Sequence, residues 1–177
     1  AAGGEHEYDA LLIATGAEPR ALPVPGLDRA NVHVLRTLSD ARAIIKACED
    51  KDSVAFIGAG FIGLEAAGAL RQRGLNVHVV APETVPMERV LGAELGRFLA
   101  GLHAAAGVQF HLGAKIDGYD GTAITLGDGT RVPAEVVIVG AGVAPRTKVA
   151  ELAGLQLQEG VVVNDRLEDA VAHLERI

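Results

Sequence analysis

Three glycines between residues 58 and 63 are the part of this sequence whose types and spacing best suit chemistry. Gly58, Gly60 and Gly63 fit the pattern G-x-G-x-x-G, and the residues between them are Ala59, Phe61 and Ile62. In such a turn the first glycine permits a tight bend, and the second lets a pyrophosphate approach the backbone. The third lets a following helix lie close to the preceding strand, while the free N–H groups of that helix face the anion. The pattern predicts a dinucleotide site, and the alternative is a tight glycine turn without a ligand.

An acidic residue at the expected distance supports the first interpretation. Glu83 lies about 20 residues beyond the turn, where a carboxylate accepts hydrogen bonds from the adenosine ribose. The first basic residue after Glu83 is Arg89, so no cationic side chain lies close enough in the sequence to bind a 2′-phosphate. We therefore expect NADH to be preferred over NADPH.

Glu65 is the one charge in an otherwise apolar stretch, residues 54–70. Its position one turn into the expected helix favours a solvent-facing carboxylate, which the positive end of the helix dipole stabilises. On periodicity alone this is the preferred interpretation.

The elements that must hold these residues follow from short apolar runs and turn residues. Strands are expected at 8–16, 53–58, 76–80, 108–112, 135–142 and 160–165, and helices at 40–49, 61–73 and 94–107. Ser39 is the expected N-cap of the first helix, the proline-rich segment 17–26 reads as a loop, and 169–177 as a short amphipathic helix. Asp-Gly pairs at 120–121 and 128–129 predict an antiparallel meander across 114–133. The predicted fold is α/β, a Rossmann-like doubly wound parallel sheet with a β-meander insert.

Composition excludes several other classes of protein. The chain is 49% hydrophobic with a formal net charge of −7 and no basic run, which argues against nucleic-acid binding. The longest apolar run is too short and too rich in glycine for a membrane span. The six histidines show no metal-ligand spacing, and the single Cys48 is expected to be a core thiol. The opening residues lack the features of a secretory leader, so we expect a cytoplasmic location.

Several separated motifs together resemble a known family. They are YDALLIATGAEPR, VAFIGAGFIGLEAAGAL, GDGTRVPAEVVIVGAGVAPRT and VVVNDRLE, in that order. They are similar to the two-dinucleotide flavoprotein reductases, and more narrowly to the ferredoxin/rubredoxin reductase and apoptosis-inducing-factor branch of the pyridine nucleotide-disulfide oxidoreductases. The family's commoner pattern places its ribose-binding acid at the position of Ala81, two residues before Glu83.

The resemblance implies roles that the residues alone do not. It places Glu65 beside the nicotinamide, which reverses the interpretation from periodicity, and it sets Gly140, Ala141 and Gly142 against the NAD pyrophosphate or nicotinamide ribose. Thr15 and Gly16 would belong to the flavin side. It further implies an NADH-binding domain at 39–145, a linking segment at 1–38 and a return segment at 146–177.

The implied function is hydride transfer from NADH to FAD, with electrons passing on to a small carrier, expected to be an iron–sulfur protein. The motif that holds the ADP half of FAD and the distal segment that holds its ribityl chain have no counterpart in this sequence. We therefore expect an NAD-binding fragment that carries no FAD and is inactive alone. The alternative is a non-enzymatic nucleotide-sensing or interaction module of the apoptosis-inducing-factor type.

Overall fold

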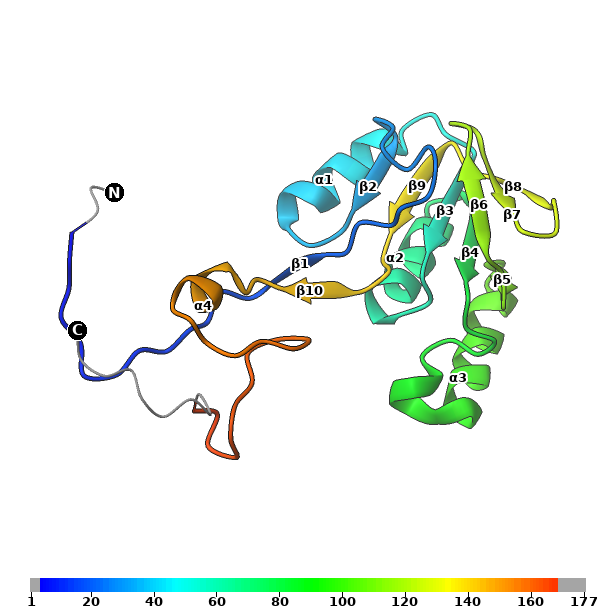
Figure 1. The fold of residues 1–177 in the computed structure, drawn as a ribbon. Coiled ribbons are helices and arrows are strands. Elements are labelled where there is room, and N and C mark those ends of the chain that lie inside the picture. Colours follow the sequence, from blue (N-terminus) through cyan, green and yellow to red (C-terminus); the bar gives the residue numbers. More distant parts are fainter. Residues whose placement is uncertain (1–3, 169–177) are drawn as a thin grey trace. The chain divides into compact units, whose positions relative to one another are not determined.

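The structure is a computed structural model that describes residues 4–168. The chain divides into two compact units (Figure 1). One unit is Pro19–Gly142, and the other holds the described residues up to Glu18 and from Val143 onward. The expected tail helix at 169–177 lies outside the described residues.

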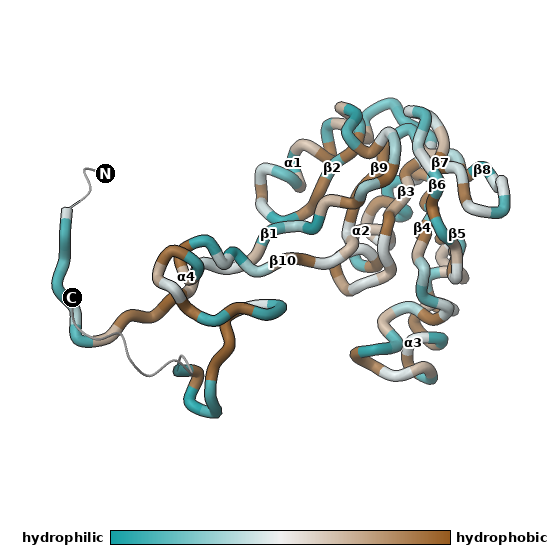
Figure 2. Tube along the Cα trace, in the orientation of Figure 1, coloured by the Kyte–Doolittle hydropathy of each residue, from teal (hydrophilic) through white to brown (hydrophobic). Residues whose placement is uncertain are grey.

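A five-stranded parallel sheet forms the centre of the unit Pro19–Gly142. Its order is β2-β9-β3-β4-β5. The strands are β2 (Val32–Val34), β9 (Val136–Val139), β3 (Ser53–Ile57), β4 (Asn76–Ala81) and β5 (Gln109–Leu112). Every residue of β3 and β9 is buried, as apolar runs covered on both faces require. Figure 2 shows the same two strands in brown, the colour of hydrophobic residues.

Helices cover one face of this sheet. They are α1 (Leu38–Ala47), α2 (Phe61–Gln72) and α3 (Glu88–Ala105). Leu64 and Ala67 of α2 are buried in one cluster with Val54 and Phe56 of β3 and with the Cys48 thiol, which is 8% exposed. Burial raises the pKa of that thiol. The prediction of a core cysteine is confirmed.

The predicted meander covers the opposite face. Its strands are β6 (Ile116–Tyr119), β7 (Ala123–Leu126) and β8 (Arg131–Pro133), paired antiparallel in that order. Ile124 and Val132 pack against Ala55 and Ile57 of β3 in a second apolar cluster. The Asp-Gly turns form as expected, because the Asp120 carboxylate accepts the N–H groups of residues 122 and 123. The predicted parallel α/β sheet with an antiparallel insert is confirmed.

The structure corrects three predicted strands or loops. The run 8–16 is not a strand: no described strand pairs with it, and Leu12 is 87% exposed. Residues 160–165 form isolated bridges and no described strand, and one of these bridges joins Val161 to Leu157. The predicted loop contains β1 (Ala17–Pro19), which pairs with β10 (Val143–Pro145), since proline is tolerated at the end of a two-stranded ribbon.

Helix boundaries also differ from those expected. The N-cap of α1 is Thr37, because its side chain accepts the Asp40 N–H while the Asp40 carboxylate accepts the N–H of Thr37. Ser39 is therefore inside the helix. Helix α3 begins at Glu88, six residues earlier than expected, with a break at Gly92, whose φ is 79°. The strand β2 and the short helix α4 (Lys148–Leu152) were not predicted.

The two ends of the unit Pro19–Gly142 meet. The Arg20 N–H donates to the Gly142 carbonyl at 3.0 Å. The chain therefore enters and leaves this unit at one point, next to the turn that follows β9.

Candidate functional site

The turn from Gly58 to Gly63 joins β3 to α2, the arrangement that the motif requires. Gly60 is the N-cap of α2, and no side chain caps that helix. A Cβ built on Gly60 would meet no atom within 4 Å, and its φ of −85° is open to any residue. The first N–H groups of a helix have no partner inside it, so this end can receive an anion.

Gly63 is glycine because the helix lies against the turn. A Cβ at Gly63 would stand 2.8 Å from the Gly58 carbonyl oxygen, closer than real Cβ atoms come. Gly58 itself has φ of +110°, a conformation that other residues rarely adopt. The first and third glycines thus serve the backbone, whereas Gly60 leaves an open surface.

A second glycine turn lies directly beside the first. A Cβ on Gly58 would come within 2.5 Å of the Gly140 carbonyl oxygen, and the Gly140 N–H donates to the Ile57 carbonyl at 2.8 Å. The Gly58 N–H donates to the Val80 carbonyl of β4 at 2.8 Å. The structure therefore brings together two of the sequence-predicted groups, residues 58–63 and 140–142, at the carboxyl edge of adjacent parallel strands. Ligands of open α/β sheets bind at that edge.

The two candidate acids are both exposed. Glu65 lies on α2, two residues beyond Gly63, and Glu83 follows β4, the neighbour of β3 in the sheet. The loop of Glu83 is fixed, because its backbone carbonyl accepts the Gly113 N–H at 2.9 Å. Ala81, where the commoner family pattern has its acid, is fully buried, so Glu83 is the side chain that reaches solvent.

The remaining residues of the turn differ in exposure. Phe61 is 57% and Ile62 52% exposed, whereas Ala59 is buried. The exposed pair offers apolar surface next to the open N-terminus of α2.

Thr15 and Gly16 belong to the other compact unit. The Thr15 hydroxyl donates to the Arg146 carbonyl at 2.6 Å, and the Gly16 carbonyl accepts the Arg146 N–H at 2.9 Å. These bonds join the segments on either side of β1 and β10.

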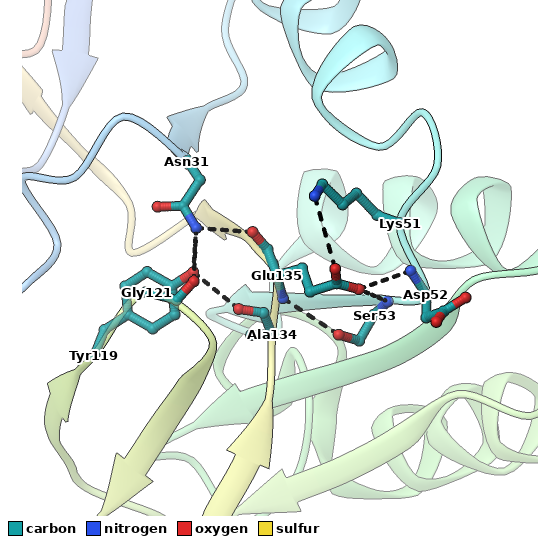
Figure 3. Close-up of polar contacts among 8 residues, drawn as sticks. All are labelled: Asn31, Lys51, Asp52, Ser53, Tyr119, Gly121, Ala134 and Glu135. Atoms are coloured by element: carbon teal, nitrogen blue, oxygen red, sulfur yellow. Dashed lines mark hydrogen bonds and ion pairs between the residues drawn. The ribbon is translucent and has the colours of Figure 1, made fainter.

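Sequence reasoning missed a polar network at the amino ends of the same strands (Figure 3). The Asn31 amide donates to the Tyr119 hydroxyl at 2.6 Å and to the Glu135 carbonyl at 2.8 Å, and the Tyr119 hydroxyl donates to the Ala134 carbonyl at 2.8 Å. The Glu135 carboxylate accepts the N–H groups of Asp52 and Ser53. No local signal marks these residues, since their partners are 15 to 104 positions away.

Two titrating groups of the network have pKa values shifted in opposite directions. Burial raises the pKa of the Tyr119 hydroxyl. The backbone N–H of Asp52 is the main cause that lowers the pKa of Glu135, with Lys51 contributing at 3.7 Å. The network ties the meander, β9 and β3 together at the amino ends of β9 and β3.

Within residues 4–168 no group of three or more histidine, cysteine or acidic side chains could hold a metal ion. In the same part of the chain, no helix is both long and apolar enough to cross a membrane.

Comparison with known proteins agrees with this geometry. A family model described as pyridine nucleotide-disulphide oxidoreductase matches residues 1–174. Rhodocoxin reductase of Rhodococcus erythropolis is 42% identical over 166 residues, which are 91% of this chain and 39% of that protein. Putidaredoxin reductase of Pseudomonas putida is 36% identical, over 92% of this chain and 41% of the relative.

Solved structures give the same result. The covalent putidaredoxin reductase–putidaredoxin complex matches with a TM-score of 0.83 and 36% identity, over 90% of this chain and 40% of that one. A ferredoxin reductase from Rhodopseudomonas palustris matches with a TM-score of 0.81 and 38% identity, over 85% of this chain and 38% of the other. The chain spans about two fifths of the length of these relatives. It belongs to the pyridine nucleotide-disulphide oxidoreductase family, on the ferredoxin reductase branch.

Proposed function

We propose that this chain binds NADH at the paired glycine turns, as the nucleotide-binding part of a longer FAD-dependent reductase. The observation that carries the proposal is the open α carbon of Gly60 at an uncapped helix N-terminus, with the second glycine turn packed against Gly58. This arrangement gives a pyrophosphate unpaired N–H donors and room to approach them.

In this proposal each part of the site binds one part of the nucleotide. The pyrophosphate lies over Gly60, and Gly140–Gly142 borders the pyrophosphate or the nicotinamide ribose. Glu83 accepts hydrogen bonds from the adenosine ribose, and Glu65 orients the nicotinamide carboxamide. The nucleotide-binding region is residues 39–145, with 1–38 and 146–177 as connections to the flavin side, where Thr15 and Gly16 lie.

The two cofactors would supply the redox chemistry: NADH would be the hydride donor and the flavin of the longer reductase the acceptor. The contribution of this chain is to bind and orient the nucleotide and to exclude competing reactions. The names of the relatives, rhodocoxin reductase and putidaredoxin reductase, support a ferredoxin-type iron–sulfur carrier as the acceptor.

Binding is tested with Gly60→Val and the matched control Gly68→Ala. Valine at Gly60 has room and an allowed φ, but its side chain would occupy the path of the pyrophosphate. Gly68 lies in the same helix, and a Cβ added there would meet the His103 ring at 3.4 Å, so alanine at this position leaves the turn intact. We expect calorimetric titration with NADH to show binding by the wild type and Gly68→Ala and none by a folded Gly60→Val. Unchanged affinity of Gly60→Val would contradict the site.

The acceptor is tested separately in the full-length reductase. Anaerobic mixing with NADH and an oxidised [2Fe–2S] ferredoxin should bleach the ferredoxin spectrum at a rate that depends on NADH. Rapid NADH oxidation without reduction of the ferredoxin would contradict the proposed partner and leave nucleotide binding standing.

A further inference from the structure

Two histidines on neighbouring strands contact each other, and the nucleotide site does not use them. His78 of β4 and His111 of β5 stand with Nδ1 and Nε2 3.2 Å apart and with their rings stacked at 5.4 Å between centroids. His78 is 5% exposed and His111 is partly buried. At this separation one ring must donate and the other accept, so at least one of the two imidazoles must be neutral.

The strand register places the pair on the meander-covered face. His111 is paired with Val80, and Val80 packs in the apolar cluster with Ile124 and Leu126 of the meander. His78 lies two residues before Val80 and therefore points to the same side. The pair thus lies between β4 and β5, on the face that the meander covers, and β5 is the edge strand of the sheet.

The charged groups around the pair come from the meander side. The Asp128 carboxylate lies in the turn between β7 and β8. It raises the pKa of His111 and so opposes the burial of His111, which lowers that pKa. Lys115 and Asp117 border Gly127, which precedes Asp128 in the same turn. From β3 this face presents the apolar side chains of Ala55 and Ile57. Among these groups, Asp128 is the one that raises the pKa of His111 and so favours a proton there.

We propose that the His78–His111 contact is a pH-sensitive link between β4 and the edge strand β5, and that it loosens on acidification. A first proton is accommodated on His111, near Asp128, and the contact survives with the protonated ring as donor. A second proton removes the acceptor and sets two positive charges within hydrogen-bond distance in a partly desolvated place. The two histidines therefore titrate as a coupled pair.

The sign of the pH dependence follows from the titration of the pair. Burial lowers the pKa of both His78 and His111 below the ordinary value of 6.5. The stability that the two histidines contribute is thus fully present above pH 6.5. It is lost as the pH falls from 6.5 through the pKa values that the histidines have in the folded state. The β5 edge also carries Gly113, whose N–H holds the loop of Glu83, so loosening it disturbs that loop as well.

A double-mutant cycle tests the coupling. His78→Gln, His111→Gln and the double variant are unfolded in urea at pH 8 and pH 5, with a chelator present. At pH 8 we expect the two sites to be coupled favourably, by roughly two- to tenfold in the unfolding equilibrium constant, as for a buried hydrogen bond. At pH 5 the coupling should vanish or reverse. His33→Gln is the matched control, because burial lowers the pKa of His33 too but no contact joins it to the pair. A coupling that is the same at both pH values would overturn the proposal.

A second measurement needs no stable variant. The imidazole resonances of the wild-type chain are followed by NMR from pH 8 to pH 4.5, together with amide exchange in β5. We expect two interacting titrations, and faster β5 exchange once the second proton binds. Two independent titrations with unchanged β5 exchange would also overturn it.

Discussion

Glu65 and Glu83 are the two carboxylates on which the proposed selectivity rests, and both are exposed at the glycine-turn edge of the sheet. A ligand-binding carboxylate must be exposed, and a functional measurement on each residue distinguishes that role from the role of a solvated surface residue.

For Glu65 that measurement is hydride transfer in the full-length reductase. Glu65→Ala should slow flavin reduction by on the order of 100-fold while changing NADH affinity much less, because a small misplacement of the reacting ring is costly. Stopped-flow reduction at saturating NADH measures the rate. Glu94→Ala, which removes an exposed helical glutamate from α3, is the control. Equal rates in Glu65→Ala and wild type would leave Glu65 as a surface residue.

For Glu83 the measurement is the ratio of NADH to NADPH affinity. A 2′-phosphate beside the carboxylate meets like charge, and a repulsion of about 2 kcal/mol gives roughly 30-fold discrimination. Titration at fixed ionic strength should show this preference in the wild type and its loss in Glu83→Ala. Tighter NADPH binding by the wild type would contradict the assignment.

At the scale of elements, the polar network of Figure 3 is the feature with the clearest energetic consequence. Tyr119→Phe removes a hydroxyl that donates to Ala134 and accepts from Asn31, and it leaves the Ala134 carbonyl without that donor. Loss of a buried hydrogen bond of this kind costs about 1–3 kcal/mol. Urea unfolding should show it, whereas Tyr8→Phe at an exposed position should change nothing. An unchanged midpoint for Tyr119→Phe would mean that the network does not hold the meander.

Elements defined by local pattern could be predicted, and those defined by a distant partner could not. Strands β3 and β9 are continuous apolar runs, and the Asp-Gly turns specify the meander by themselves. Strand β2 has only three residues, His33 among them, and exists because it pairs with β9. The run 8–16 has strand composition but no described partner. Ser39 is predicted as the N-cap of α1, but Thr37 is an equally good N-cap residue. The hydrogen bond from the Thr37 N–H to the Asp40 carboxylate decides in favour of Thr37.

At the scale of the whole molecule, the sequence-predicted site residues belong to different compact units. The glycine turns and Glu83 lie in Pro19–Gly142, whereas Thr15 and Gly16 lie in the other. In the first unit the sequence predicts that the glycine motif joins a strand to a helix, because G-x-G-x-x-G binds a dinucleotide at such a junction. It could not predict that Gly58 and Gly140 touch, since that contact depends on β9 lying next to β3.

The same division predicts the cofactor content of the purified chain. Thr15 and Gly16 are its only residues proposed for the flavin side, so we expect it to purify without FAD and to lack NADH oxidase activity while still binding NADH. The visible absorption spectrum of the purified chain checks this directly. A flavin band near one equivalent would contradict it.

The hydrogen bond from the Arg20 N–H to the Gly142 carbonyl makes residues 19–142 a cassette. The points where the chain enters and leaves the unit are joined by one backbone hydrogen bond. A graft into another reductase would therefore need two splice points that lie next to each other. The central sheet and the meander would be transferred whole, because their strands all lie between those points. Exchange of nucleotide preference between reductases could then proceed by recombination of this cassette, without redesign of the host.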